Sequence, residues 1–349
     1  MDTMNTTYYF GAGASALVLP TYSDFTEKLD SFVKLFGSGS GFSKLSPEDR
    51  KIALEINRIG NEYLSNEQFS ATPDRFARTE FSKGKSLKDL KMLLILFFAE
   101  RQSSIVSINN DSYKRRILID PRIDELMSHI IQPIRGKANL DPKFKILTWN
   151  YDFQFEMAFG RHSNSSGYHS YIDLQGFPNI DDDDEPRKFD NSRFSIVHLN
   201  GVAFFENGAV SMPFNNKISE EEQLVRFIIK YYYHIVRNYC PKKGGIDSLK
   251  FAFEYFDETT KPPKAESLDA AITIALNTKD LIISGYSFPS FNRDFDRSIF
   301  DNFVSLESVV IKDLPGKEQT LLKTVGNLLL GNFEKNKIEF DINVQTYIN

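Results

Sequence analysis

The sequence is poor in cysteine and has no surplus of positive charge, and each shortage excludes a class of protein. Its 349 residues contain one cysteine, Cys240, which can form neither an internal disulfide bond nor a four-cysteine zinc site. The formal net charge is −5 at pH 7, so the composition does not indicate the basic surface of a nucleic-acid-binding protein. We therefore expect no zinc or other bound metal, and no direct contact with nucleic acid.

Long apolar runs are also missing. The most apolar stretch, residues 92–99, is too short to span a bilayer and predicts a buried helix instead. Residues 1–10 lack the basic start and the small-residue cleavage pattern of a signal peptide. We expect a soluble cytoplasmic protein, and its hydrophobic fraction of 41% is enough to build a sizeable core.

Short apolar runs predict the strands of a parallel sheet. Such runs occupy residues 6–10, 144–148, 195–199, 280–284 and 308–312, and residues 337–344 alternate weakly, as an edge strand would. Helical patterns separate the later strands, at residues 220–239, 267–277 and 292–303. Because strands that alternate with helices favour parallel pairing, we expect an α/β fold in which helices are layered on the sheet.

Residues 47–134 have a mostly helical pattern and interrupt this alternation. We interpret them as a helical insertion, at about residues 40–140, between the first two strands of a single domain that spans residues 1–349. An acidic run, DDDDE at residues 181–185, lacks the glycine and the spacing of a calcium-binding loop. It is expected to be a solvated loop.

Four distinctive segments each begin where a predicted strand ends. They are GAGAS at residues 11–15, TWNYD at 148–152, HLNG at 198–201 and GYSFPSFN at 285–292. In an open parallel sheet, ligands bind outside the carboxyl ends of the strands. We therefore expect the four segments to converge on one ligand-binding crevice.

The first two segments have the side chains that a dinucleotide needs. Gly11 and Gly13 would let the backbone approach a pyrophosphate, while Ser15 and the N-terminus of a following helix would donate hydrogen bonds. A plain tight turn is the alternative. Asn150 offers an amide, and Asp152 can meet a ribose hydroxyl or support Asn150, unless the two residues only form an Asx turn.

The third segment contains a histidine at the end of its strand. Alternation along the strand places His198 and Asn200 on the same side of the sheet. A histidine there can act as a base, or it can be a partly buried strand residue with a backbone partner.

In this order, GAGAS, TWNYD, HLNG and GYS resemble the motifs of the sirtuin-like superfamily, and most of all the sirtuin-like NAD-cleaving domains of bacterial anti-phage defence systems. The segment TPDRFA at residues 72–77 is also similar to a motif of those bacterial domains. The resemblance covers about residues 7–313. It implies a Rossmann-like NAD site in which the first glycine-rich loop holds the pyrophosphate.

The motifs and the resemblance together give the candidate site residues. The catalytic candidates are Asn150, placed by the resemblance beside the nicotinamide ribose, and His198. The cofactor-binding candidates are Gly11, Ala12, Gly13, Ser15, Asp152, Asn200, Gly201, Gly285, Ser287 and Asn292. The family's histidine usually precedes the glycine directly, where this sequence has Asn200. Either His198 or Asn200 therefore serves in its place, or cleavage proceeds without a histidine base.

The resemblance implies an NAD glycohydrolase that releases nicotinamide and ADP-ribose and depletes NAD during anti-phage defence. Sirtuin deacylases carry a four-cysteine zinc domain, which this sequence cannot form, so hydrolysis of NAD is favoured over protein deacylation. Implied partners are a helicase-like ATPase, an Argonaute-type protein, a nucleotide-sensing enzyme or further copies of the chain. Two alternatives stay open: a module that senses NAD or ADP-ribose without cleavage, and a protein deacylase or ADP-ribosyl transferase.

Overall fold

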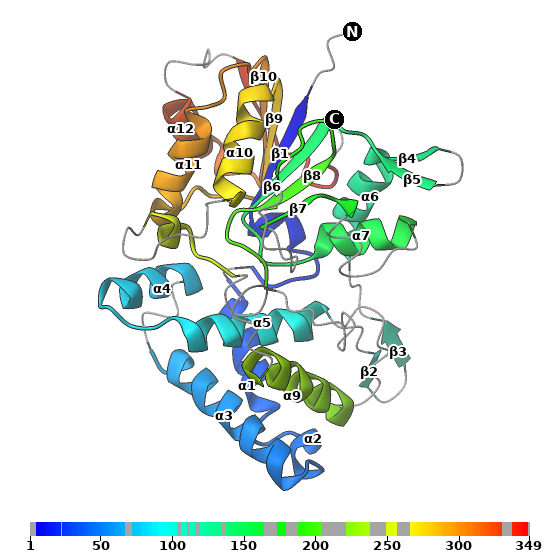
Figure 1. Ribbon diagram of the computed structural model, residues 1–349, viewed down its shortest axis with the longest axis vertical. Helices are drawn as coiled ribbons and strands as arrows, with labels where there is room; N and C mark the ends of the chain where they lie inside the picture. Colours follow the sequence, from blue (N-terminus) through cyan, green and yellow to red (C-terminus); the bar gives the residue numbers. More distant parts are fainter. Residues whose placement is uncertain are drawn as a thin grey trace. The chain divides into compact units, whose positions relative to one another are not determined.

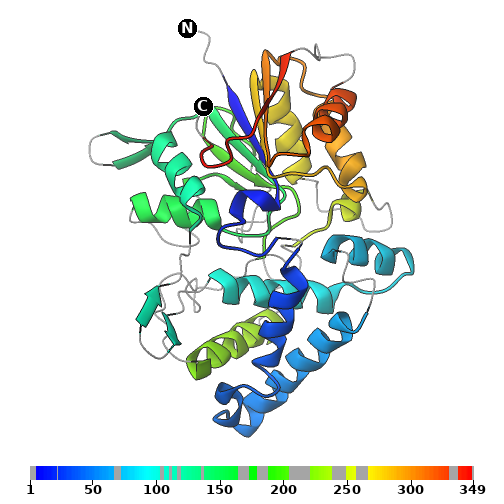
Figure 2. The same cartoon turned by 180° about the vertical axis from the view of Figure 1, so that it is seen from behind.

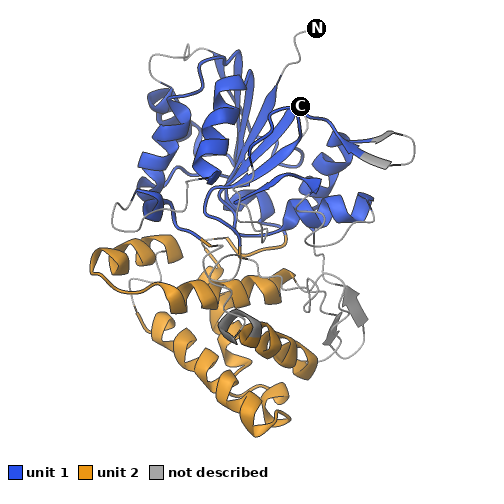
Figure 3. Cartoon of the chain, viewed as in Figure 1, with its two compact units in different colours: residues 1–17, 119–202, 250–349 blue, residues 18–118, 203–249 orange. Residues whose placement is uncertain are grey.

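The computed structural model divides the chain into two compact units (Figure 3). The sheet unit comprises Met1–Leu17, Ile119–Val202 and Lys250–Asn349, and the helical unit comprises Val18–Leu118 and Ala203–Leu249. The structure describes residues 5–21, 23–66, 72–102, 106–109, 112–115, 119–134, 137–163, 173–178, 188–203, 221–237, 249–256, 266–329 and 337–347.

The sheet unit is built on seven parallel strands (Figure 1). They are β1 (Thr6–Phe10), β6 (Phe144–Thr148), β7 (Gly176–Phe177), β8 (Ser195–His198), β9 (Asp280–Ser284), β10 (Ser308–Lys312) and β11 (Ile338–Asp341). Their spatial order is β11-β10-β9-β1-β6-β8-β7, and every neighbouring pair is parallel. The predicted Rossmann-like α/β fold is confirmed, including the edge strand near residue 340. The two-residue strand β7 was not predicted.

Helices cover both faces of this sheet. The helices are α6 (Pro121–Ile130), α7 (Gln154–Ser163), α10 (Glu266–Asn277), α11 (Arg293–Phe300) and α12 (Glu318–Leu328). Alternate strand residues such as Tyr9 and Leu147 belong to one buried core with α10, α11 and α12. On the opposite face Phe10 lies 5.3 Å from the ring of Phe155 in α7. Burial on both faces explains why the strands read as continuous apolar runs.

The strand order creates a switch point between β1 and β9. From β1 the chain continues outward on one side through β6 and β8, and it then returns to place β9 on the other side of β1. Figure 2 shows the same sheet from behind. In sheets of this type the loops diverge at such a point, and ligands bind there at the carboxyl ends of the strands.

In its described residues, the helical unit packs six helices around an apolar centre. They are α1 (Phe25–Lys34), α2 (Ser40–Ser43), α3 (Pro47–Leu64), α4 (Pro73–Ser82), α5 (Lys88–Gln102) and α9 (Glu221–Arg237). Residues 90–100 of α5 are all buried, as the apolar run at 92–99 predicted. Phe32 of α1 meets Phe97 of α5 edge-on at 5.7 Å. No described helix of either unit combines the length and apolarity that crossing a membrane requires.

The bounds of the helical part differ from the predicted insertion at about 40–140. The helical unit starts earlier, at Val18, and its second segment contains α9, which the strand-helix alternation assigned to the sheet. Residues 119–140 belong to the sheet unit. Two hairpins also replace predicted helix, β2 (Val106–Asn109) with β3 (Ser112–Arg115) and β4 (Ile131–Ile134) with β5 (Lys137–Leu140). Strands of four residues are too short to outweigh a neighbouring helical pattern.

A buried polar network joins the carboxyl ends of β1, β6 and β9 to α11. Tyr9 and Tyr286 both donate hydrogen bonds to the Asp296 carboxylate, over 2.7 Å and 3.0 Å. Trp149 Nε1 donates to Tyr9 Oη, and Asn292 Nδ2 donates to Tyr286 Oη. Asp296 is fully buried, and burial raises its pKa to about 7 although the tyrosine hydrogen bonds oppose this shift.

We predict that Asp296→Asn changes the pH dependence of stability. Because the folded-state pKa is raised, the stabilising contribution of this carboxyl is fully present at low pH and is lost as pH rises through about 7. The unfolding free energy of the wild type minus that of the variant should fall by about 2–3 kcal/mol between pH 5 and pH 8. Urea unfolding followed by the fluorescence of Trp149, the one tryptophan, measures this difference.

The matched control is Asp294→Asn, an exposed residue on the same helix. Its difference from the wild type should stay constant over the same pH range. A constant difference for Asp296→Asn as well would contradict a raised pKa at that position.

Candidate functional site

The four segments that follow β1, β6, β8 and β9 start from one row of residues across the sheet. Phe10 is paired in register with Thr148 on one side and with Ser284 on the other, and Thr148 is paired with His198. Since the strands are parallel and adjacent, all four segments leave the same edge of the sheet at the same level. The four segments thus lie at one edge of the sheet, as predicted, and the ligand-binding crevice stays a prediction.

The first and last of these segments pack together backbone to backbone at the switch point. Gly11 N donates to Ser284 O over 3.1 Å, and Gly13 N donates to Gly285 O over 3.0 Å. A Cβ atom on Gly11 would lie 2.6 Å from Gly285 O, and one on Gly285 would lie 2.6 Å from Gly13 C. Gly285 also has a φ of +62°, which favours glycine. The glycines are therefore needed for contact between the two loops.

No α-helix begins directly at this loop. Ala12–Ser15 forms a single 3₁₀ turn, η1, and the next described helix, α1, begins only at Phe25. The N–H groups of Gly11 and Gly13 donate to Ser284 O and Gly285 O, so they are not free to bind a ligand. The prediction that a helix N-terminus supplies N–H groups here is wrong.

Three residues from distant parts of the chain hold η1 in place. The Arg122 guanidinium donates to Gly13 O and Ala14 O over 3.1 and 3.2 Å, and it is paired with Asp120 at 2.7 Å. Tyr347 Oη donates to Ala14 O over 2.7 Å, and the Tyr347 side chain is fully buried. These residues escape prediction because their only local pattern, Asp120 before Pro121, marks the start of a helix.

Asn150, Ser15 and Asp152 form a continuous hydrogen-bonded chain. Asn150 Nδ2 donates to Ser15 Oγ over 3.1 Å, and Ser15 Oγ donates to Asp152 Oδ2 over 2.8 Å. All three side chains are buried. The structure thus brings together three predicted site residues from two different segments.

The carboxyl group of Asp152 caps the first turn of α7. Its Oδ1 accepts from Gln154 N over 3.1 Å. Burial raises the pKa of Asp152 to about 6, although the hydrogen bonds from Gln154 and Ser15 oppose the shift. Asp152 is therefore ionised above about pH 6. In that form it accepts a hydrogen bond from the Ser15 hydroxyl, which orients Ser15 Oγ to accept from Asn150 Nδ2.

His198 lies behind Asn150. Its ring is fully buried, with Nδ1 3.1 Å from Asn150 O and Nε2 2.9 Å from Glu156 Oε1. Glu156 comes from the first turn of α7 and is also fully buried. Nothing in the sequence marks Glu156 as a site residue, because one acidic residue in a first helical turn is ordinary.

The remaining predicted residues have other surroundings. The strand ends at His198, so alternation does not extend to Asn200, whose Nδ2 donates to Tyr151 Oη over 3.2 Å.

Asn292 belongs to the network around Asp296. Gly201 has a φ of +67° that favours glycine in its turn. Ala12 and Ser287 are exposed at the carboxyl edge.

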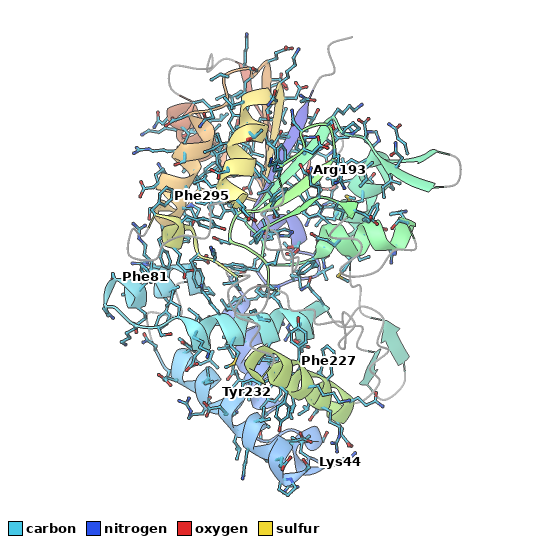
Figure 4. The ribbon with its side chains drawn as sticks, viewed as in Figure 1. Lys44, Phe81, Arg193, Phe227, Tyr232 and Phe295 are labelled. Carbon is cyan, nitrogen blue, oxygen red and sulfur yellow. The ribbon has the colours of Figure 1, made fainter. Side chains whose placement is uncertain are left out.

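Aromatic packing fixes the backbone of the TWNYD segment. Trp149 stacks on Tyr286 at 5.7 Å, and Phe295 of α11, labelled in Figure 4, meets Trp149 edge-on at 5.2 Å. These rings cover the side of the segment opposite to His198, so Asn150 is held between two packed layers.

Other features of the sequence lie in the helical unit or outside the described residues. Thr72 of the TPDRFA segment caps α4 by accepting from Arg75 N over 3.0 Å, which is an ordinary helix start in the helical unit. Cys240 and the acidic run at 181–185 lie outside the described residues. Within the described part of the chain, no three acidic, histidine or cysteine residues are grouped as metal ligands would be.

Comparisons with known proteins do not assign the chain to a family. No protein-family model, no curated protein and no solved structure matches it. The interpretation of the site therefore depends on the geometry above and on the motif resemblance.

We predict that Gly285→Ala is far more destabilising than Gly316→Ala. Both glycines have positive φ, +62° and +93°, but a Cβ on Gly316 meets nothing within 4 Å, whereas one on Gly285 meets backbone atoms of Gly13 and Ala14. Gly316→Ala should cost about 1–2 kcal/mol for the left-handed conformation alone. Gly285→Ala should cost at least about 2 kcal/mol more, because two backbone segments must separate. Chemical unfolding measures both, and equal costs would show that the loop contact is not tight.

Proposed function

We propose that the chain is an NAD glycohydrolase of the sirtuin-like type, which hydrolyses the nicotinamide–ribose bond to nicotinamide and ADP-ribose. The observation that carries this proposal is the convergence of the four motif segments at the switch point of a Rossmann-like sheet, with Asn150 held at their centre. A switch point with glycine-rich loops is typical of a dinucleotide-binding site.

The chemistry asks little of the protein beyond positioning. The nicotinamide–ribose bond breaks with its electron pair moving to the ring nitrogen, whose positive charge is thereby neutralised. Water then attacks the cation-like ribosyl carbon and loses a proton to solvent. A site for this reaction must orient the ribose, stabilise developing positive charge and admit water.

Asn150 has the geometry for this positioning role. Its Nδ2 is used by Ser15, whereas its Oδ1 makes no hydrogen bond to any described residue. The amide is therefore oriented with an acceptor oxygen available for a ribose hydroxyl or for the attacking water. Because Ser15 and Asp152 are buried and fixed, this orientation is set before any ligand arrives.

The setting of the reaction follows from the resemblance. We propose that the enzyme depletes NAD in anti-phage defence and is restrained until a partner protein or self-assembly activates it. A helicase-like ATPase, an Argonaute-type protein and a nucleotide-sensing enzyme are the partner classes. The isolated chain should then cleave NAD slowly, and a partner encoded by a neighbouring gene should accelerate it.

A module that senses NAD or ADP-ribose without cleavage is the second candidate. The observation that favours it is the full burial of His198, which removes the predicted base from contact with a ligand. The two functions share one binding site and differ only in whether nicotinamide is released.

We predict that Asn150→Ala lowers nicotinamide release by about 10²-fold or more while NAD still binds, because the amide orients the reacting ribose. Release is measured by chromatography with purified chain and millimolar NAD, and binding by the change in Trp149 fluorescence. Asn277→Ala is the control, because Asn277 ends α10 at the amino edge of the sheet and its side chain is exposed. Its release rate should equal that of the wild type.

Each other outcome has a definite meaning. Wild-type release by Asn150→Ala would show that the amide is not catalytic. NAD binding without release, alone and with the neighbouring-gene protein, would establish the sensing module. No binding of NAD at millimolar concentration would reject both functions.

A further inference from the structure

We propose that Glu156 and His198 form a buried, ion-paired unit that positions Asn150 through its backbone carbonyl, and that His198 is not the general base. The catalytic consequence depends on the proposed function, whereas the ion pair itself does not. Glu156 is a positioning residue that no motif in the sequence marks.

The proton positions on His198 follow from its two neighbours. Nδ1 faces Asn150 O at 3.1 Å, and a carbonyl oxygen can only accept, so Nδ1 carries a proton. Nε2 faces Glu156 Oε1 at 2.9 Å, and a carboxylate oxygen likewise accepts. Both ring nitrogens are therefore donors, and the ring has no lone pair with which to take a proton from the ribose or from water.

The surrounding charges keep this second proton on the ring. Burial alone would lower the pKa of His198, but the charge and hydrogen bond of Glu156 outweigh it, and the Asn150 carbonyl and the charge of Asp152 act in the same direction. The net effect is a pKa above the usual value.

Among the described residues, the Glu156 carboxylate has a hydrogen-bond partner at one oxygen only. Glu156 Oε2 makes no hydrogen bond with any described residue, so Oε1 and the His198 ring are its polar connection to the site. A buried carboxylate with one open oxygen is stable only when its charge is compensated. His198 provides that compensation, which ties the two residues together electrostatically.

The Glu156–His198 pair helps to hold Asn150 in place. Asn150 N donates to Thr148 Oγ1 over 3.1 Å, Asn150 O accepts from His198 Nδ1, and Asn150 Nδ2 donates to Ser15 Oγ. The peptide group and the side-chain amide of one residue are thus held at three points from three elements. A displacement of about 1 Å in a positioning group can reduce turnover by about 10²-fold. Loss of the His198 contact should therefore lower the rate of nicotinamide release.

A carboxylate–imidazole pair can instead be the base-orienting part of a catalytic triad. In that arrangement one ring nitrogen contacts the carboxylate and the other faces the group that gives up its proton. Here the second nitrogen faces a main-chain carbonyl in the interior. The geometry therefore assigns positioning and not proton transfer to His198.

Two double variants separate these roles. In His198→Asn with Glu156→Gln, both buried charges are removed together, and the asparagine amide nitrogen occupies the place of Nδ1 and can still donate to Asn150 O. In His198→Ala with Glu156→Gln, the donor is lost. We expect the first to reduce nicotinamide release by no more than about tenfold with the wild-type pH profile, and the second by about 10²-fold or more. Equal losses of 10²-fold or more, with both variants folded, would overturn the proposal in favour of a base.

A second measurement needs no NAD cleavage and no variant that must fold well. Nitrogen-15 NMR of histidine-labelled wild-type protein distinguishes a ring with two protonated nitrogens from a neutral ring. The chain has 5 histidines, so the signal of His198 is identified by its absence from the His198→Asn double variant, or by its burial-slowed exchange. We expect His198 to be doubly protonated at pH 7, whereas a neutral ring at that pH would overturn the ion pair. If NAD is not cleaved and the ring is charged, the proposed function fails and the ion pair stands.

Discussion

Contact between the backbones of two glycine loops is the constraint on which the rest of the site depends. Gly11 and Gly13 after β1 lie against Gly285 after β9, with no room for a Cβ atom on either side. This contact joins the two loops at the switch point, and the β1 loop continues directly into the 3₁₀ turn η1. Ser15, at the end of η1, is placed beside Asn150 as a result. A side chain at any of these glycines would shift the residues that we assign to the ribose.

Two buried polar clusters lie on opposite sides of the TWNYD segment and hold it in place. Trp149 is bonded through Tyr9 to the Asp296 cluster under α11, and Asn150 is bonded to His198 and Glu156 under α7. Neighbouring residues of one loop thus connect to helices on opposite faces of the sheet. Buried polar groups of this kind are costly unless they are fully paired. Their pairing selects one loop conformation, which is what a preorganised site requires.

The sequence was sufficient to predict the strands and their convergence, because apolar runs and the residues at strand ends are local signals. It predicted that Asn150 and Asp152 share a site, and Ser15 joins them. The partners Glu156, Arg122 and Tyr347 could not be predicted, since each acts through a contact between segments far apart in the chain. The prediction that a helix N-terminus donates N–H groups at this loop also failed, because the next helix begins only at Phe25. Likewise, the role of His198 depends on what surrounds its ring, and periodicity along a strand carries no such information.

The hydrogen bond from Tyr347 to Ala14 joins residues 333 positions apart. During synthesis the glycine loop emerges from the ribosome well before the tyrosine that binds it. At ordinary rates of translation this interval is roughly 20 to 70 s. For that time the nascent chain has its β1 loop without one of the hydrogen bonds that hold it. The β1 loop can therefore complete its hydrogen bonds only after Tyr347 has been synthesised, long after the strand that precedes the loop.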